Sequence, residues 1–263
     1  ALDPVVIAFR DRQLERRYPF VMADALYTKV RENGRIRSKG FMVAVGINEQ
    51  GFREILGFSC ADSETEAGWT TFFRELKGRG LSQVDMVISD SHKGLVKAVK
   101  QCFQGAAWQR CQTHFSRNML DVCPKKLHPE MKAALKSLYE AGDYETAVLL
   151  RDNILLRFQQ EAPKAAALLE ESFEDVMAVL ALPFAMRRRL RTTNGIERLN
   201  EEIRRRERVI RIFPNEESLS RLIGALLMEI NDGWQSGKVY LDLTAYLTQQ
   251  LQVDKPTAKK SVA

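Results

Sequence analysis

Two aspartates stand at positions where a carboxylate is costly to bury. Asp24 lies inside the apolar run VMADAL (residues 21–26), and Asp90 directly follows the apolar stretch VDMVIS (residues 84–89). A buried carboxylate needs a partner, a proton or a bound cation. Asp90 by itself is explained equally well as the N-cap of a following helix. If the two carboxylates converge, they repel by roughly 4 kcal/mol at about 4 Å and an effective dielectric near 20, and a shared divalent cation such as Mg²⁺ would compensate.

A third acid would complete a divalent-metal site. The segment from Arg187 to Arg211 offers Glu197, Glu201 and Glu202 as candidates. Glu197 and Glu201 are four residues apart, so both lie on one face of a helix. Periodicity alone therefore leaves the choice between them open.

The same segment carries the net charge of the chain. It holds ten arginines, four glutamates and no lysine, while the rest of the 263 residues balance acidic against basic groups, so the segment accounts for the formal net charge of +6. The planar guanidinium group of arginine matches phosphate oxygens through paired hydrogen bonds. This pattern favours a polyanionic partner. The alternative is a solvated helix face on which glutamate and arginine pair within the helix.

Five strands and two helices are predicted for the first 110 residues, in the order β-β-β-α-β-α-β. Apolar stretches separated by short polar, glycine-containing connections predict three antiparallel strands; a capped amphipathic helix, a fourth strand, a second helix and a fifth strand follow. The strands are expected at 21–30, 41–47, 53–60, 84–89 and 106–110. In one familiar topology this order places strands 1 and 4 side by side, which would bring Asp24 and Asp90 together.

The strand signals stop at Thr113. From there to about Leu182, leucine, alanine and glutamate recur at helical spacing, which predicts an all-helical block of about seventy residues. A long helix is then expected from Thr193 to Ile210, and another from about Glu216. The tail from Leu251 is polar, as disordered chain ends commonly are.

The composition excludes several classes of protein. With 45% hydrophobic residues the chain can bury a substantial core, so disorder cannot be its dominant state. No uncharged apolar run approaches the roughly 18 residues of a membrane span, and we expect no membrane partner. Four cysteines are too few for a disulfide scaffold and fit a reducing cytoplasm.

Three stretches resemble signature sequences of the mutator-type transposases of bacterial insertion sequences. They are SDSHKGL (89–95), RCQTHFSRNML (110–120) and the segment 192–231, which begins TTNGIERLNEEIRRR. The resemblance extends over residues 2–246. This chain departs from the family pattern at Ser91, where glycine is usual, and at Gly195, where a larger apolar residue is common.

The resemblance implies an α/β fold of the ribonuclease H-like type, with a mixed sheet and an all-helical insertion before the third catalytic acid. The family's Asp-Asp-Glu triad falls on Asp24, Asp90 and Glu197. These residues would be both the catalytic acids and the ligands of two Mg²⁺ or Mn²⁺ ions. The implied organisation is a catalytic core at 1–110 and 183–246, the insertion at 111–182 and a disordered tail at 247–263.

The implied activity is that of a DDE transposase, which hydrolyses a DNA phosphodiester at the ends of its element and then joins the freed 3′-hydroxyl to target DNA. The expected partner is double-stranded DNA, bound by a homodimer or larger assembly on the nucleoid in a bacterial cytoplasm. The arginines expected to hold its backbone are Arg198, Arg204, Arg205, Arg206 and Arg208. The rival hypotheses are a ribonuclease H-like nuclease that cuts without joining and an inactive DNA-binding relic.

The family's Cys-x-x-His signature falls on Cys111 and His114, whose role the resemblance leaves open. Cys123 and His128 follow, so a four-ligand zinc site is one alternative. A packed cysteine with a hydrogen-bonded histidine is favoured, because the segment is helical and the spacing matches no common zinc finger. The family also carries an N-terminal helix-turn-helix region that recognises element ends. We expect it to be missing here, since only about twenty residues precede the first strand.

Overall fold

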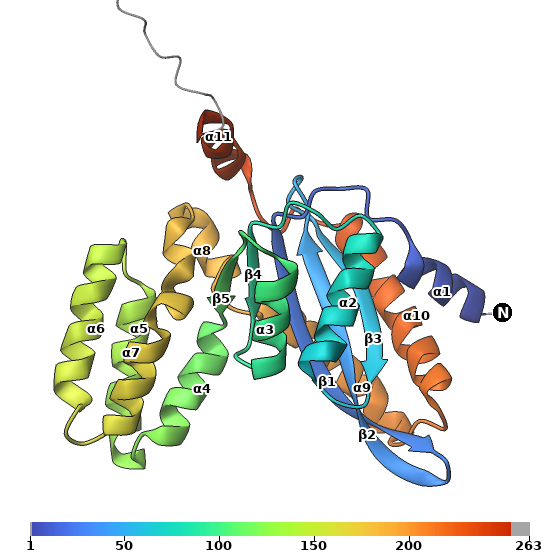
Figure 1. Ribbon diagram of the computed structural model, residues 1–263, viewed down its shortest axis with the longest axis horizontal. Coiled ribbons are helices and arrows are strands. Elements are labelled where there is room, and N and C mark those ends of the chain that lie inside the picture. Colours follow the sequence, from blue (N-terminus) through green and yellow to red (C-terminus); the bar gives the residue numbers. More distant parts are fainter. Residues whose placement is uncertain (1, 254–263) are drawn as a thin grey trace, which may run out of the picture.

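A computed structural model of the chain describes residues 2–253. Its strands are β1 (Phe20–Glu32), β2 (Arg35–Ile47), β3 (Arg53–Ala61), β4 (Met86–Ser89) and β5 (Ala107–Arg110). They form one mixed sheet in the order β3-β2-β1-β4-β5 (Figure 1). β1, β2 and β3 pair in antiparallel fashion, whereas β4 lies parallel to β1 and β5 parallel to β4. The predicted adjacency of strands 1 and 4 is confirmed.

Both faces of the sheet are buried, because apolar side chains alternate between them along each strand. On β1, Phe20, Met22 and Leu26 contribute to one core, while Val21 and Ala23 contribute to the other. The first core is covered by α1 (Asp3–Asp11), α9 (Asn194–Ile210) and α10 (Glu216–Gln235), and the second by α2 (Glu66–Gly78) and α3 (Lys93–Cys102) (Figure 1). α1 is the one of these five helices that the sequence does not predict.

Between β5 and α9 the described chain contains helices and no strand, which confirms the all-helical block predicted for 113–182, whereas the helix at 184–190 is not predicted by the sequence. This part of the chain comprises two 3-10 turns and the helices α4 (Gln112–Val122), α5 (His128–Tyr139), α6 (Tyr144–Phe158), α7 (Pro163–Met177) and α8 (Phe184–Leu190). Helices α4 to α7 bury a core of their own beside the β5 edge of the sheet (Figure 1). Gln109 of β5 ties the two parts together, because its side-chain amide donates to the Val176 carbonyl over 2.7 Å and accepts from the Val179 N–H over 2.6 Å.

The first two strands, of 13 residues each, are longer than predicted. Their pairing continues past the apolar stretch to Glu32 and Arg35. There Asn33 and Gly34, both with positive φ, close the hairpin, as Asn-Gly does in two-residue hairpin loops. The sequence predicts a connection at these polar residues instead of a strand. Alternation of apolar residues reveals a strand only where one of its faces is buried in a core.

The last described helix, α11 (Thr244–Val253), corrects part of the disordered tail expected at 247–263. Leu243 and Tyr246 are buried against the first core, and the Tyr246 hydroxyl donates to Asp85 over 2.9 Å. These anchors order a stretch whose polar composition alone predicts disorder. Residues 254–263 lie outside the described residues. Within 2–253, no helix combines the length and the apolar character needed to cross a membrane.

Candidate functional site

Asp24 lies on β1, and Asp90 directly follows β4, the parallel neighbour of β1. The last pair of the β1–β4 ladder is Met22 with Ile88, so Asp24 and Asp90 each follow two residues beyond it. Neighbouring strands lie about 4.8 Å apart. The strand pairing thus brings together two of the three predicted acids.

Cys111 directly follows β5 and, with Asp24 and Asp90, forms a row across three neighbouring strands. Ser89 of β4 is paired with Arg110 of β5, so Asp90 and Cys111 are level immediately after the two strands end. The Cys111 N–H donates to the Ser89 carbonyl over 2.7 Å, which extends the ladder by one residue. The row thus lies at the carboxyl ends of β4 and β5, the edge at which open α/β sheets usually carry their sites.

Asp24 is on the side of β1 that packs against α9. Its Oδ2 accepts a hydrogen bond over 2.9 Å from Nδ2 of Asn200, a residue of α9. Burial and the nearby charge of Asp90 raise the pKa of Asp24 to about 7, while His114 acts in the opposite direction. The protein alone therefore leaves the charged form of Asp24 undercompensated, and a bound cation would stabilise it.

Glu197 reaches the site from the first turn of α9. The preceding residue, Ile196, is fully buried in the first core, which docks this turn against β1. Oε1 of Glu197 lies 3.9 Å from Nε2 of His114. This oxygen is buried and has no hydrogen-bond partner within residues 2–253, so it remains free to bind a cation or a water. Glu201 is exposed, which favours Glu197 between the two.

Cys111 anchors the start of α9. Its Sγ accepts hydrogen bonds from the backbone N–H and the hydroxyl of Thr193, over 3.4 and 3.3 Å, and both residues are fully buried. Burial raises the pKa of Cys111, but His114 and Thr193 together bring it below its ordinary value. The neighbouring Cys111 in turn raises the pKa of His114 to about 9. The signature pair therefore connects the end of β5 to the helix that carries Glu197.

The four residues of the zinc alternative do not come together. Cys123 is buried, and its carbonyl lies 3.0 Å from Nε2 of His128. Within the described residues, the ligand atoms that lie within 4.8 Å of one another belong to Cys111, His114 and Glu197 instead. Cys111 and His114 thus lie beside Glu197 and do not form a site with Cys123 and His128.

A second group of acids surrounds a lysine. Glu32, Asp62 and Glu216 have carboxylate oxygens within 4.8 Å of one another, and all three form ion pairs with the ammonium group of Lys39. The Lys39 side chain is only 4% exposed. The ammonium group of Lys39 therefore already compensates these carboxylates, so we do not consider them a candidate metal site.

Glu64 lies near Asp90, which the sequence does not predict, because Glu64 stands just before a predicted helix. Its side chain is 11% exposed and lies 3.9 Å from Nδ1 of His92. Burial raises the pKa of Glu64; His92 opposes this and Asp90 adds to it. A signal for this proximity exists in Gly94, where an added Cβ would lie 2.9 Å from the Glu64 carbonyl oxygen. Only a residue without a side chain lets these two helix starts approach so closely.

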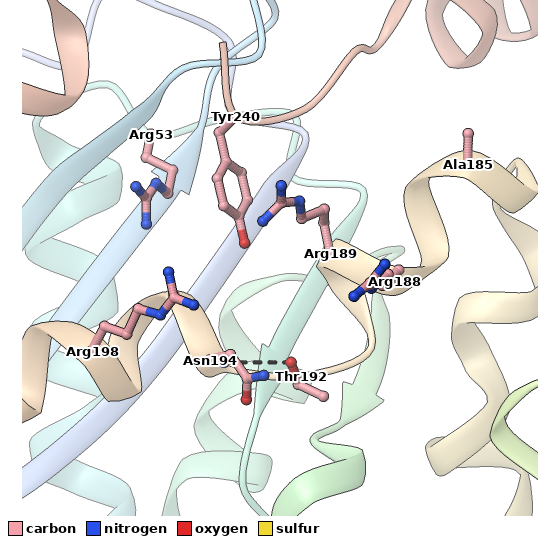
Figure 2. Close-up of a pocket in the computed structure, with 9 residues that line it drawn as sticks. Arg53, Ala185, Arg188, Arg189, Thr192, Asn194, Arg198 and Tyr240 are labelled. Carbon is pink, nitrogen blue, oxygen red and sulfur yellow. Dashed lines mark hydrogen bonds between the residues drawn. The ribbon is translucent and has the colours of Figure 1, made fainter. Parts of the chain in front are cut away.

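The five arginines predicted to bind DNA are all exposed on α9: Arg198, Arg204, Arg205, Arg206 and Arg208. Arg205 and Arg206 form ion pairs with Glu202, over 2.6 and 3.4 Å. Arg205 and Arg206 thus form the intrahelical pairs with glutamate that are expected of a solvated helix face. Arg198 instead borders a pocket that also holds three other arginines (Figure 2).

Comparisons with known proteins agree with the signature stretches. A family model described as "Transposase, Mutator family" matches residues 1–237. The chain is 44% identical over 245 residues to the transposase for insertion sequence element IS256 in transposon Tn4001 of Staphylococcus aureus. It is 43% identical over 243 residues to the transposase for IS1081 of Mycobacterium tuberculosis, and 40% identical over 242 residues to that for ISRM5 of Rhizobium meliloti. The matches cover 92% of this chain but 63%, 59% and 61% of these relatives.

Proposed function

Because the chain belongs to the Mutator family of transposases, we propose that it cuts DNA at the ends of an insertion sequence and joins the freed 3′-hydroxyl to target DNA. The proposed chemistry is that of a DDE transposase on a ribonuclease H-like core. Its catalytic acids are Asp24, Asp90 and Glu197.

The observation that carries this proposal is that Asp24 of β1 and Asp90, directly after the parallel strand β4, each follow two residues beyond the last pair of the β1–β4 ladder. Two carboxylates so close together repel each other, and the raised pKa of Asp24, caused by burial and by Asp90, expresses that cost. Packing of α9 across β1 brings a third carboxylate to the same side of the sheet. Three acids from segments far apart in sequence are typical of a site built for divalent cations.

The available groups fit Mg²⁺ or Mn²⁺, because carboxylate oxygens are the ligands that both ions prefer. The unpartnered Oε1 of Glu197 and the undercompensated Asp24 are the atoms that such ions would satisfy. When bound, two ions would activate the attacking oxygen and stabilise the leaving oxygen of the phosphodiester. Asp24, Asp90 and Glu197 would hold them.

Other side chains would position these acids. Asn200 donates to Asp24 and fixes the direction of its carboxylate. Cys111 holds Thr193, and with it the first turn of α9, against the end of β5. His114 lies between Cys111 and Glu197 and supplies a positive charge beside the acids. This arrangement gives the signature pair a positioning role.

Double-stranded DNA is the proposed substrate, both as element end and as target. The exposed arginines of α9 would hold its phosphates near Glu197 without reading its sequence. Because an insertion sequence has two ends, we include a homodimer or larger assembly on the DNA, acting at the bacterial nucleoid, in the proposal.

The test is a cleavage and joining assay with the full chain. The substrate is duplex DNA carrying the terminal sequences of the insertion sequence that encodes the protein, with and without Mg²⁺ or Mn²⁺. We expect ion-dependent cuts at the ends and a strand-transfer product. Glu197→Gln should abolish both while DNA binding persists. Glu201→Gln removes the same charge from an exposed position of the same helix and should remain active.

Each rival hypothesis predicts a different result. Ion-dependent cutting without a joined product would indicate a nuclease. Binding of DNA without any ion-dependent cutting would indicate an inactive relic. An active Glu197→Gln variant beside an inactive Glu201→Gln variant would overturn the assignment of the third acid.

A further inference from the structure

A pocket of about 430 Å³ beside the start of α9 is lined by four arginines. Arg53 comes from β3, Arg188 and Arg189 from α8, and Arg198 from α9. No acidic residue is among the lining residues that the structure describes. The four positive charges therefore face a space that holds no counter-charge from this part of the chain.

Aromatic rings hold two of these guanidinium groups in place. The Arg53 guanidinium lies 4.0 Å from the ring centre of Trp234 and 4.4 Å from that of Tyr240. Arg189 lies 5.0 Å from the Tyr240 ring centre, and Figure 2 shows Tyr240 between the two arginines. Stacking on a ring face stabilises a guanidinium group through cation–π attraction. Its N–H groups, which lie in the guanidinium plane, stay available for a ligand.

The pocket arginines differ from their neighbours in how they are bonded. Arg187 donates to the Leu182 carbonyl over 2.8 Å, and Arg191 donates to the Tyr139 carbonyl over 3.0 Å, so both serve the fold. Within residues 2–253, none of the four pocket guanidinium groups has such an acceptor or a carboxylate partner. Each guanidinium has five N–H donors. The pocket thus brings together positively charged N–H donors that have no acceptor among the described residues.

This concentration of charge has a cost that an anion would relieve. Burial lowers the pKa of Arg53, and the charges of Arg189 and Arg198 lower it further, with Tyr240 acting in the opposite direction. Paired hydrogen bonds from arginine to phosphate oxygens are among the strongest charge-assisted contacts in proteins. Gly195 also lines the pocket, and a Cβ added there would lie 3.6 Å from the Tyr240 hydroxyl and 3.7 Å from Arg53. A small residue here keeps the space open.

We propose that this pocket binds a phosphate of the DNA backbone beside the carboxylates. The proposal rests on the proposed function, in which DNA is the substrate. Asn194, Gly195 and Arg198, which line the pocket, lie in the first two turns of α9, as Glu197 does. A strand held by the arginines therefore passes next to the third acid. The pocket would set the position of that strand relative to Asp24, Asp90 and Glu197 without reading its sequence.

The triple variant Arg188→Gln, Arg189→Gln, Arg198→Gln tests the pocket. These side chains are exposed, so the fold should persist, and a thermal melt followed by circular dichroism checks this. The control Lys132→Gln, Lys136→Gln, Lys164→Gln removes the same charge from exposed positions of the helical block. Binding of a fluorescent DNA duplex is measured in EDTA between about 0.05 and 0.2 M salt, where counterion release is readily observed.

We expect the triple variant to lose at least about tenfold in affinity and the control less than about twofold. The slope of log K against log salt should fall by about 1 to 2 in the triple variant, since each phosphate contact contributes about 0.9. Tyr240→Ala removes the ring against which the Arg53 and Arg189 guanidinium groups lie, and it should also weaken binding. Inorganic phosphate at equal ionic strength should compete with DNA on the unaltered chain and not on the triple variant.

Equal losses in the triple variant and the control would overturn the proposal. So would inorganic phosphate binding that depends on the arginines while DNA affinity does not, because the ligand would then be free phosphate. The proposed function is tested separately. If DNA binding depends on the pocket arginines but no ion-dependent cutting occurs, the pocket proposal stands and the transposase chemistry is refuted. If the chain cuts DNA but the triple variant binds DNA as tightly as the unaltered chain, the transposase chemistry stands and the pocket proposal is refuted.

Discussion

Replacing Asp24 by asparagine should stabilise the protein when no metal is bound. The pKa of the Asp24 carboxyl is about 7 in the folded protein, because of burial and of Asp90, against an ordinary 3.8. At about 1.36 kcal/mol for each pH unit, the ionised carboxylate lowers the free energy of unfolding by at most about 4 kcal/mol near pH 8. Asparagine has no charge, and its single side-chain oxygen can accept the hydrogen bond from Asn200, while the acceptor that Asp24 Oδ1 offers to the Ala25 N–H is lost.

The dependence on pH follows from proton binding. The folded chain holds the Asp24 proton more tightly than the unfolded chain, so the stability of the unaltered protein falls as the pH rises from about 4 to about 7 and stays low above that. Asp24→Asn removes this dependence. Its advantage should be about 1 to 4 kcal/mol near pH 8 and smaller near pH 5.

Urea unfolding in EDTA at these two pH values measures the difference. Asp121→Asn, a change at an exposed aspartate of α4, is the control and should leave stability unchanged. Added Mg²⁺ should stabilise the unaltered chain and not Asp24→Asn, because a ligand that binds the folded state raises its stability. A variant no more stable than the unaltered chain near pH 8, or an advantage that grows toward pH 5, would refute the reasoning.

Substitutions at Cys111, Gly51 and Gly195 test three further sites by urea unfolding. Cys111→Val leaves the buried donors of Thr193 without an acceptor and should cost about 1 to 3 kcal/mol; Cys111→Ser should restore most of this, and cleavage rates should follow the same order. Gly51→Ala should cost about 1 to 3 kcal/mol more than Gly34→Ala. Both glycines have positive φ, but an added Cβ at Gly51 would lie 2.0 Å from a carbonyl oxygen, whereas at Gly34 nothing lies within 4 Å. Gly195→Ala meets only ordinary contacts, the nearest at 3.5 Å, and should stabilise α9 by up to about 1 kcal/mol.

The adjacency of Asp24 and Asp90 could be predicted because each aspartate interrupts or ends an apolar run, and short connections fix the order of the first strands. The place of Cys111 in the same row could not. It depends on the register between β4 and β5, which is set by backbone pairing and not by side-chain pattern. The choice of Glu197 over Glu201 likewise needs the packing of α9 on β1, since both have the same helical phase.

Arg53 and Tyr240 show a different limit. Neither belongs to the arginine-rich segment, and each is unremarkable in its local sequence. Their approach depends on Gly51, whose carbonyl accepts the N–H groups of Tyr240 and Leu241 over 3.0 and 3.1 Å. Such a contact between a turn and a segment almost two hundred residues away follows from the whole fold, so no local pattern signals it.

The contact between Thr193 and Cys111 joins residues 82 positions apart. The entropy lost on closing a segment of this length opposes the contact by about 4 kcal/mol, and only the packing of the intervening helices offsets that loss. A nascent chain can therefore complete the sheet, and align Asp24 with Asp90, before Glu197 arrives. Under the proposed function we expect this order of folding to act as a safeguard, because a chain whose helical block is not yet packed would carry two of the proposed acids without Glu197 and would not cut DNA.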